Sequence, residues 1–158
     1  MKSIRVERNN NVGNIVLANS SYNRLDVRFA SYLEEAVHEA NENDIRIPVL
    51  RAEGPNLSLG GEVREWPGKD ANWFCTFVAK VNSSYRAIEA LRFPTVAIMQ
   101  GAAFGGGFGL ALSCDSIVTA DDPIFRCVGS RQLCCLSRVL FNASLSALGA
   151  VARRVFLC

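Results

Sequence analysis

The first residues of the chain alternate between apolar and polar side chains, as strands with one buried face do. Residues 4–7 and 12–17 carry this alternation, and the asparagines at 9–11 between them are typical of a turn. The pattern predicts two strands joined by a short connection.

Two longer segments repeat apolar residues every three or four positions, as one face of an α-helix does. Asp26 and Asp70 stand where these helices should begin, because an aspartate can accept hydrogen bonds from the free N–H groups of a first turn. Residues 41–44 should stop the first helix, and Pro94 should end the second because the residue before a proline is driven out of the helical region. The stripes comprise Phe29, Ala30, Leu33, Ala36, Val37 and Ala40, then Phe74, Phe77, Val81, Ser84, Ile88 and Leu91.

Three short apolar runs lie between and after these helices, at residues 46–52, 95–100 and 116–120. Such runs are typical of strands buried on both faces. The glycine-rich residues 101–109 are predicted to lead from the second of these strands into a short helix. Strands that alternate with helices predict an α/β fold.

The composition is that of one globular domain. The 158 residues are 49% hydrophobic and 20% charged. No apolar run is long enough to span a bilayer, and the first residues lack the apolar core of a secretory signal, so we expect a cytoplasmic protein without a membrane partner. Nucleic-acid binding is not expected either, because the excess of basic residues is confined to the end of the chain.

The last residues differ in character from the rest. The first 122 residues hold 12 Lys and Arg against all 15 Asp and Glu, whereas the last 36 hold five Arg and no other charged residue. Four of the six cysteines also lie there, without the spacing of a zinc site. We therefore predict a core of residues 1–125 and an atypical basic, cysteine-rich tail of residues 126–158. The spacing of its apolar residues would allow a helix. We interpret the change of character as a truncated or altered carboxyl terminus.

Two glycine-bearing segments follow buried strands and are candidates for chemistry. Residues 56–66 contain the pair Gly60-Gly61, and paired glycines let a ligand approach the backbone closely. Residues 101–109 contain three successive glycines at the expected start of a helix, where free N–H groups suit an oxygen with developing negative charge. The structural alternative is a plain strand-to-helix turn for the first segment and tight packing of a helix on a strand for the second, and the density of glycines makes the second harder to explain by packing alone.

Nucleotide binding is the competing interpretation of the second segment. A P-loop would need Gly-Lys-Ser/Thr at its end, which is absent. A dinucleotide fingerprint that starts at Gly105 fails at Leu110, although Asp121 imitates the ribose-binding acid of that fold. A dinucleotide domain is therefore kept only as a weak competitor.

Both segments resemble the crotonase (enoyl-CoA hydratase/isomerase) superfamily. Residues 57–66, Leu-Ser-Leu-Gly-Gly-Glu-Val-Arg-Glu-Trp, are similar to its first oxyanion loop. Residues 93–115, which run from Phe-Pro-Thr-Val-Ala-Ile through Gly-Gly-Gly to Ser-Cys-Asp, are similar to the second, and residues 23–26 to its Asn-Ala-Leu motif. The resemblance covers residues 4–125 and implies a crotonase-like spiral of repeated ββα units, with its C-terminal part incomplete.

The resemblance also implies a site. The amides of Gly61 and Gly106 would form an oxyanion hole, with Gly60 and Gly105 beside the substrate and Leu59 and Val63 lining the adenine end of the cleft. The implied ligand is an acyl-CoA or acyl-carrier-protein thioester, so coenzyme A would enter as part of the substrate, with no prosthetic group and no metal. A homo-oligomer, trimer or hexamer, is implied if the C-terminus permits it.

Departures from the family pattern concern the acid and base. Gly109 stands where the hydratase branch has a catalytic glutamate, and Gly129 falls near the place of the second. Without these carboxylates, addition of water to a double bond lacks its usual proton donor and acceptor. Glu62, Glu65 and Asp70 remain as other candidates. The alternative is an inactive relative that only binds a thioester or assembles with a partner.

Overall fold

The computed structural model describes residues 3–20, 22–42, 45–119 and 123–126. Its elements, in chain order, are β1 (Ile4–Asn9), β2 (Val12–Leu17), α1 (Val27–Glu42), β3 (Ile47–Ala52), the 3₁₀ turn η1 (Val63–Glu65), α2 (Ala71–Glu89), β4 (Val96–Met99), β5 (Ala102–Phe104), α3 (Gly106–Leu112), β6 (Ser116–Thr119) and β7 (Ile124–Arg126).

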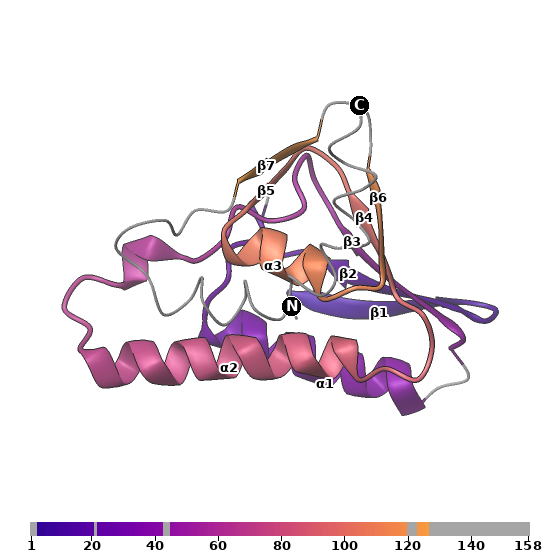
Figure 1. The fold of residues 1–158 in the computed structure, drawn as a ribbon, viewed down its shortest axis with the longest axis horizontal. Coiled ribbons are helices and arrows are strands. Elements are labelled where there is room, and N and C mark those ends of the chain that lie inside the picture. Colours follow the sequence, from indigo (N-terminus) through magenta and orange to yellow (C-terminus); the bar gives the residue numbers. More distant parts are fainter. Residues whose placement is uncertain (1–2, 21, 43–44, 120–122, 127–158) are drawn as a thin grey trace.

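A five-stranded sheet forms one layer, in the order β1-β2-β3-β4-β6. The β1–β2 hairpin is antiparallel, and every later pair is parallel. Helices α1 and α2 run side by side along one face of the sheet (Figure 1). The alternating, helical and buried patterns in the sequence thus predicted each of these strands and both helices.

A second, smaller layer begins where the strands of the main sheet end. It contains the parallel pair β5–β7 and two isolated bridges, Leu25↔Gly61 and Ser58↔Ala103. The fold is therefore the predicted α/β spiral, in which a strand of each layer is followed by a helix, as β4, β5 and α3 show in Figure 1.

The prediction that residues 101–109 lead directly from a strand into a short helix is partly wrong. Residues 102–104 form strand β5, and the strand β7 and turn η1 were not anticipated. A three-residue strand is too short to show a period of two in the sequence. Strand β5 exists because Ser58 and β7 supply its hydrogen-bonding partners from distant parts of the chain.

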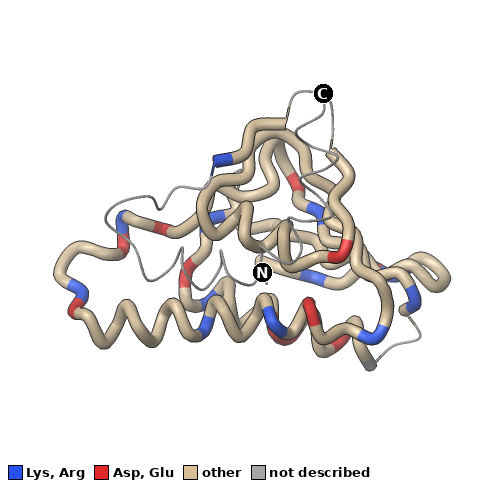
Figure 2. The backbone as a smooth tube through the Cα atoms, viewed as in Figure 1, with Lys and Arg blue, Asp and Glu red and all other residues tan. Residues whose placement is uncertain are grey.

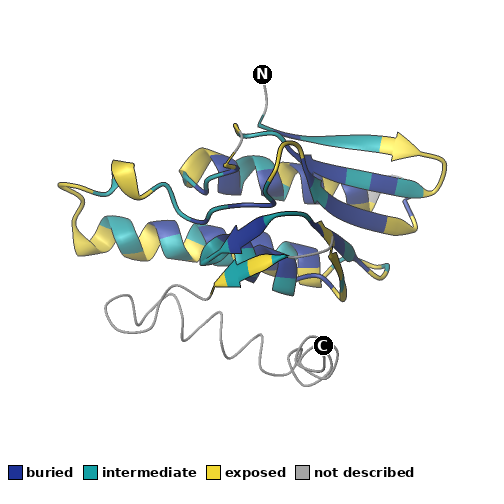
Figure 3. Cartoon of the chain, turned by 90° about the horizontal axis from the view of Figure 1, so that it is seen from above, coloured by how far each residue is buried: buried dark blue, intermediate teal, exposed yellow. Residues whose placement is uncertain are grey.

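Buried residues follow the middle of the sheet and the inner side of each helix (Figure 3). Both predicted caps are present, because the amide of Phe29 donates to Asp26 (2.6 Å) and that of Trp73 to Asp70 (2.8 Å). In α2, Phe74 is only half-buried, whereas Tyr85, absent from the predicted stripe, is buried. A tyrosine escapes a search for apolar residues because its ring packs like phenylalanine and its hydroxyl does not.

Asp115 joins β4 to the start of β6. Its Oδ2 accepts hydrogen bonds from the amide and the hydroxyl of Thr95, both at 2.8 Å, and Thr95 is buried. The variant Asp115→Ala leaves this buried amide without its acceptor, and we expect a loss of about 1–3 kcal/mol in the free energy of unfolding. Urea denaturation measures the loss. The control Asp115→Asn, which keeps one oxygen, should lose less stability. An unchanged denaturation midpoint for Asp115→Ala would show that the hydrogen bonds between Asp115 and Thr95 do not stabilise the fold.

The predicted tail, residues 126–158, lies almost wholly outside the described residues, as does Gly129. The boundary after residue 125 stays a prediction. Within the described part, no helix is long and apolar enough to cross a membrane.

Candidate functional site

The two glycine-bearing loops lie side by side. The amide of Leu57 donates to the carbonyl of Gln100 (3.1 Å), and that of Ser58 to Ala102 (3.3 Å). In return, the amide of Phe104 donates to the carbonyl of Ser58 (3.0 Å). Segments that are more than 40 residues apart in the sequence thus pair like two short strands.

Glycines are required where the loops touch. At Gly60, φ is +79°, and a Cβ atom there would lie 2.6 Å from the carbonyl oxygen of Phe104 and 3.6 Å from the amide nitrogen of Gly106. At Gly107, a Cβ atom would lie 2.4 Å from the carbonyl oxygen of Ser58. These contacts are with backbone, which cannot rotate away as a side chain can, so the first loop is held against the start of α3.

The peptide between Gly60 and Gly61 is fixed by Leu25. The carbonyl of Gly60 accepts from the amide of Leu25 (2.9 Å), and every described peptide is trans. In a trans peptide the N–H points opposite to the carbonyl, so the N–H of Gly61 points away from Leu25. Among the described residues, nothing accepts a hydrogen bond from it.

The N–H of Gly106 is free in the same way within the described part of the chain. The carbonyl of Gly105 accepts from the amides of Phe108 and Gly109, both at 3.1 Å, so the N–H on the other side of that peptide points out of the helix. Gly105 has φ +51° and ψ −119°, a conformation that a side chain disfavours. Helix α3 has only seven residues, so the direct N–H donor matters more here than the dipole of the helix.

Leu25 contacts both loops. Its carbonyl accepts from the amide of Glu62 (2.9 Å), and its Cδ1 lies 2.5 Å from where a Cβ atom of Gly106 would be. The neighbouring Asn23 is fully buried and donates to the carbonyls of Glu53 and Asn56, both at 3.3 Å. Asn23 and Leu25, which only the resemblance had pointed to, therefore fasten the first loop.

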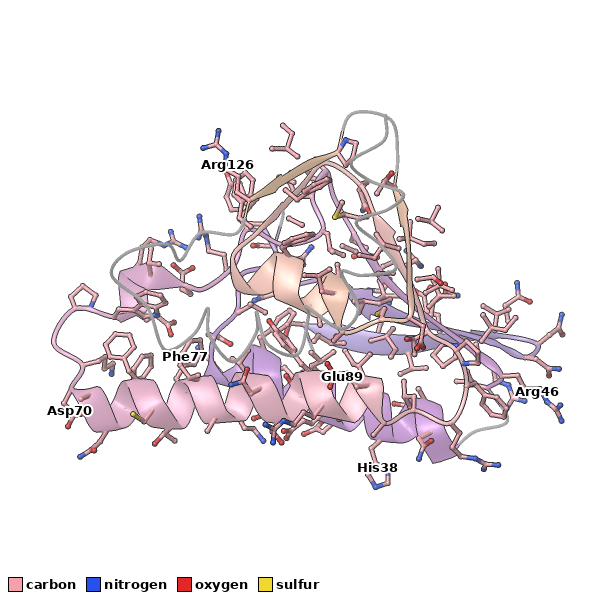
Figure 4. All side chains as sticks on the ribbon, in the orientation of Figure 1. His38, Arg46, Asp70, Phe77, Glu89 and Arg126 are labelled. Carbon is pink, nitrogen blue, oxygen red and sulfur yellow. The ribbon has the colours of Figure 1, made fainter. Side chains whose placement is uncertain are left out.

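An aromatic cluster stands beside Gly61. A ring carbon of Trp66 lies 2.8 Å from where a Cβ atom of Gly61 would be, so a side chain at that position would require Trp66 or the loop to move. Trp66 meets Phe74 and Phe77 of α2 edge-on, and Trp73 stacks on Phe77. Figure 4 shows Phe77 on the side of α2 that faces the second layer. The two tryptophans are thus packed, half-buried residues.

The other predicted substrate-binding residues lie at or next to these loops. Leu59 is half-buried, and its amide donates to the carbonyl of Tyr22 (2.9 Å). Val63 opens the turn η1 and is 50% exposed. Their contact with a coenzyme A cleft stays a prediction.

The candidate acids and bases have structural partners or lie in solvent. Asp70 caps α2, and Glu65 is exposed. His38 is exposed on α1 and points away from the sheet in Figure 4. Gly109 is a buried residue of α3, so the position of the family's glutamate carries no carboxylate. Among the described residues, no group of three acidic, histidine or cysteine side chains could hold a metal ion.

Glu62 is ion-paired with Arg64, whose side chain donates to it at 2.6 and 2.7 Å. These hydrogen bonds lower the pKa of Glu62 from 4.5 to about 2. The pair therefore stabilises the fold at pH values above about 4.5 and loses its effect as the pH falls towards 2. We expect the carboxylate to remain ionised at pH 4 in a carbon-detected NMR titration; an apparent pKa of 4 or higher would contradict the pairing and reopen Glu62 as a proton donor.

Charges of both signs are interspersed along the described backbone (Figure 2). In the described part of the chain, backbone amides and the aromatic rings of Trp66, Phe74 and Phe77 frame the site, and Arg24 donates to the carbonyl of Gly61 at 3.3 Å. Its defining chemistry is a pair of N–H groups, on two loops in contact, that donate to no acceptor among the described residues.

Comparison with known proteins identifies the class. The family model for enoyl-CoA hydratase/isomerase matches residues 7–132, and the chain belongs to this family, the crotonase superfamily. Methylglutaconyl-CoA hydratase of Mus musculus is 33% identical over 115 residues, which are 70% of this chain and 37% of that protein. Enoyl-CoA hydratase domain-containing protein 3 of Rattus norvegicus is 31% identical over 75% of this chain and 40% of its own length.

Solved structures agree on the fold. An enoyl-CoA hydratase of Shewanella pealeana superposes with a TM-score of 0.83 at 25% identity, covering 96% of this chain and 59% of that one. A Legionella pneumophila structure described as an enoyl CoA hydratase/isomerase (crotonase) superposes at 0.85 with 24% identity, covering 98% and 61%. The chain spans less than half the length of the curated relatives it matches.

Proposed function

We propose that this chain binds an acyl-CoA or acyl-carrier-protein thioester and holds its carbonyl oxygen between the amides of Gly61 and Gly106. The observation that carries the proposal is the contact between the two loops, with Gly60 packed against Phe104 and close to the Gly106 nitrogen. The proposal requires that the N–H groups of Gly61 and Gly106, on these touching loops, converge on a single acceptor atom.

Such a site favours reactions that pass through an enolate. Removal of a proton or a carboxyl group next to a thioester carbonyl moves negative charge onto its oxygen. Preorganised N–H donors stabilise this charge, and each is worth about 3 kcal/mol in related acyl chemistry. Because the donors are backbone groups, residues 61 and 106 matter through their small size.

Gly109 restricts the reaction class. Hydration needs a carboxylate at that position or a substitute for it. We therefore favour isomerisation, decarboxylation or thioester hydrolysis over classical hydration. In these reactions the proton would be carried by the substrate, by water or by another part of the protein.

We propose a homo-oligomer, trimer or hexamer, as the working assembly. Light scattering after size-exclusion chromatography would test this proposal.

The test is calorimetric titration of the purified chain with acetyl-CoA and with S-ethyl-CoA, a thioether that lacks the carbonyl oxygen. We expect acetyl-CoA to bind about tenfold tighter or more, since one good hydrogen-bonded contact is worth roughly 1.5 kcal/mol. Equal affinities would refute the oxyanion site. Turnover of enoyl- and malonyl-type thioesters is measured in parallel, and carbonyl-dependent binding without turnover would identify an inactive relative.

A further inference from the structure

Tyr85 of α2 contacts the second glycine-bearing loop at Gly106. Its hydroxyl donates a hydrogen bond to the carbonyl oxygen of Gly106 at 2.6 Å. The same oxygen atom of Tyr85 lies 3.2 Å from where a Cβ atom of Gly106 would be. The residue is 3% exposed, so this hydrogen bond forms without competition from water.

The second loop needs such an anchor. Gly105, Gly106 and Gly107 are consecutive, and each glycine adds backbone freedom that must be lost when a donor is held still. Helix α3 holds the carbonyl of Gly105 through the amides of Phe108 and Gly109, and packing contacts come from Ser58 on Gly107 and from Leu25 on Gly106. Within the described part of the chain, Tyr85 alone supplies a side-chain hydrogen bond to the glycine triplet.

The bond acts close to the donor without touching a ligand. The carbonyl that Tyr85 holds belongs to Gly106 itself, so it shares one α-carbon with the Gly106 N–H. Fixing this carbonyl restricts rotation about that α-carbon and therefore the direction of the N–H group. Burial also raises the pKa of Tyr85 well above its usual value, so the hydroxyl stays a donor across the working pH range.

The same helix also supports the first loop. Phe74 and Phe77 of α2 pack edge-on against Trp66, which lies on Gly61. Helix α2 thus reaches both loops, through a hydrogen bond at one and through aromatic contacts at the other.

We propose that Tyr85 is a positioning residue that, together with the helix hydrogen bonds to the carbonyl of Gly105, holds the direction of the Gly106 N–H and so tunes the strength of the carbonyl-binding site. The proposal rests on the proposed function of that site. In this proposal the hydroxyl of Tyr85 orients the donor, whereas its ring only fills the core.

The test compares Tyr85→Phe with Tyr32→Phe, a matched loss of one hydroxyl from a partly buried tyrosine of α1. For each variant the ratio of affinities for acetyl-CoA and S-ethyl-CoA is measured. We expect this ratio to fall roughly three- to tenfold in Tyr85→Phe with the S-ethyl-CoA affinity unchanged. Tyr32→Phe should keep the wild-type ratio.

A second measurement follows the ligand-free Gly106 amide by ¹⁵N–¹H NMR, which should shift in Tyr85→Phe and not in Tyr32→Phe. An unchanged ratio in Tyr85→Phe, or an equal loss of affinity for both ligands, overturns the positioning role while the site itself stands. If wild-type protein does not distinguish the two ligands, the proposed function fails first and the role of Tyr85 fails with it.

Discussion

Gly60→Ala is expected to reduce thioester turnover, or carbonyl-dependent binding if the chain does not turn over, by about 100-fold or more. The new Cβ atom would lie 2.6 Å from the carbonyl oxygen of Phe104, a contact that requires the backbone to move. Alanine also disfavours the φ of +79° at this position. Both effects push the first loop away from the start of α3 and separate the two N–H donors.

The matched control is Gly68→Ala. Gly68 has nearly the same φ, +78°, but no atom within 4 Å of the added Cβ. It therefore reproduces the backbone strain without the collision. Activity and affinity are compared at a temperature where circular dichroism shows both variants folded. Equal activity in the two variants would mean that the spacing of the loops does not matter.

Gly101→Ala is expected to have the largest effect on stability. A Cβ atom there would lie 2.0 Å from the carbonyl oxygen of Pro55 and 2.9 Å from the side chain of Asn56, at a φ of +56°. Strain and overpacking each cost about 1–3 kcal/mol, so we expect a loss of about 2–6 kcal/mol in the free energy of unfolding.

Urea denaturation measures this loss, again against Gly68→Ala, which should lose only about 1 kcal/mol. The difference between the variants isolates the collision with the loop at residues 55–56. A Gly101→Ala protein no less stable than Gly68→Ala would show that the close packing between this turn and that loop is wrong.

The helices and the main sheet could be predicted from the sequence because their signals are local. Asp26 and Asp70 each accept the hydrogen bond expected of a helix cap, and the apolar runs match β3, β4 and β6 within one residue. Strands β5 and β7 were missed because three residues carry no periodic pattern. Their partners lie far away in the sequence.

The site was predicted through resemblance rather than through pattern alone. The glycine pairs indicated close backbone contacts, but nothing local indicated that residues 57–60 pack against residues 104–107. That proximity depends on the parallel pairing of β3 with β4, which brings the ends of both strands to the same edge. Tyr85 gave no signal, because its hydroxyl acts on a carbonyl 21 residues away. The cytoplasmic location and the nature of residues 127–158 stay predictions.

A crystal structure of the chain with a bound acyl-CoA tests the central claim most directly. We expect the thioester oxygen within about 2.7–3.1 Å of the amide nitrogens of both Gly61 and Gly106. A thioester oxygen that contacts neither nitrogen, or two N–H groups that point to different sides of the loops, would contradict it.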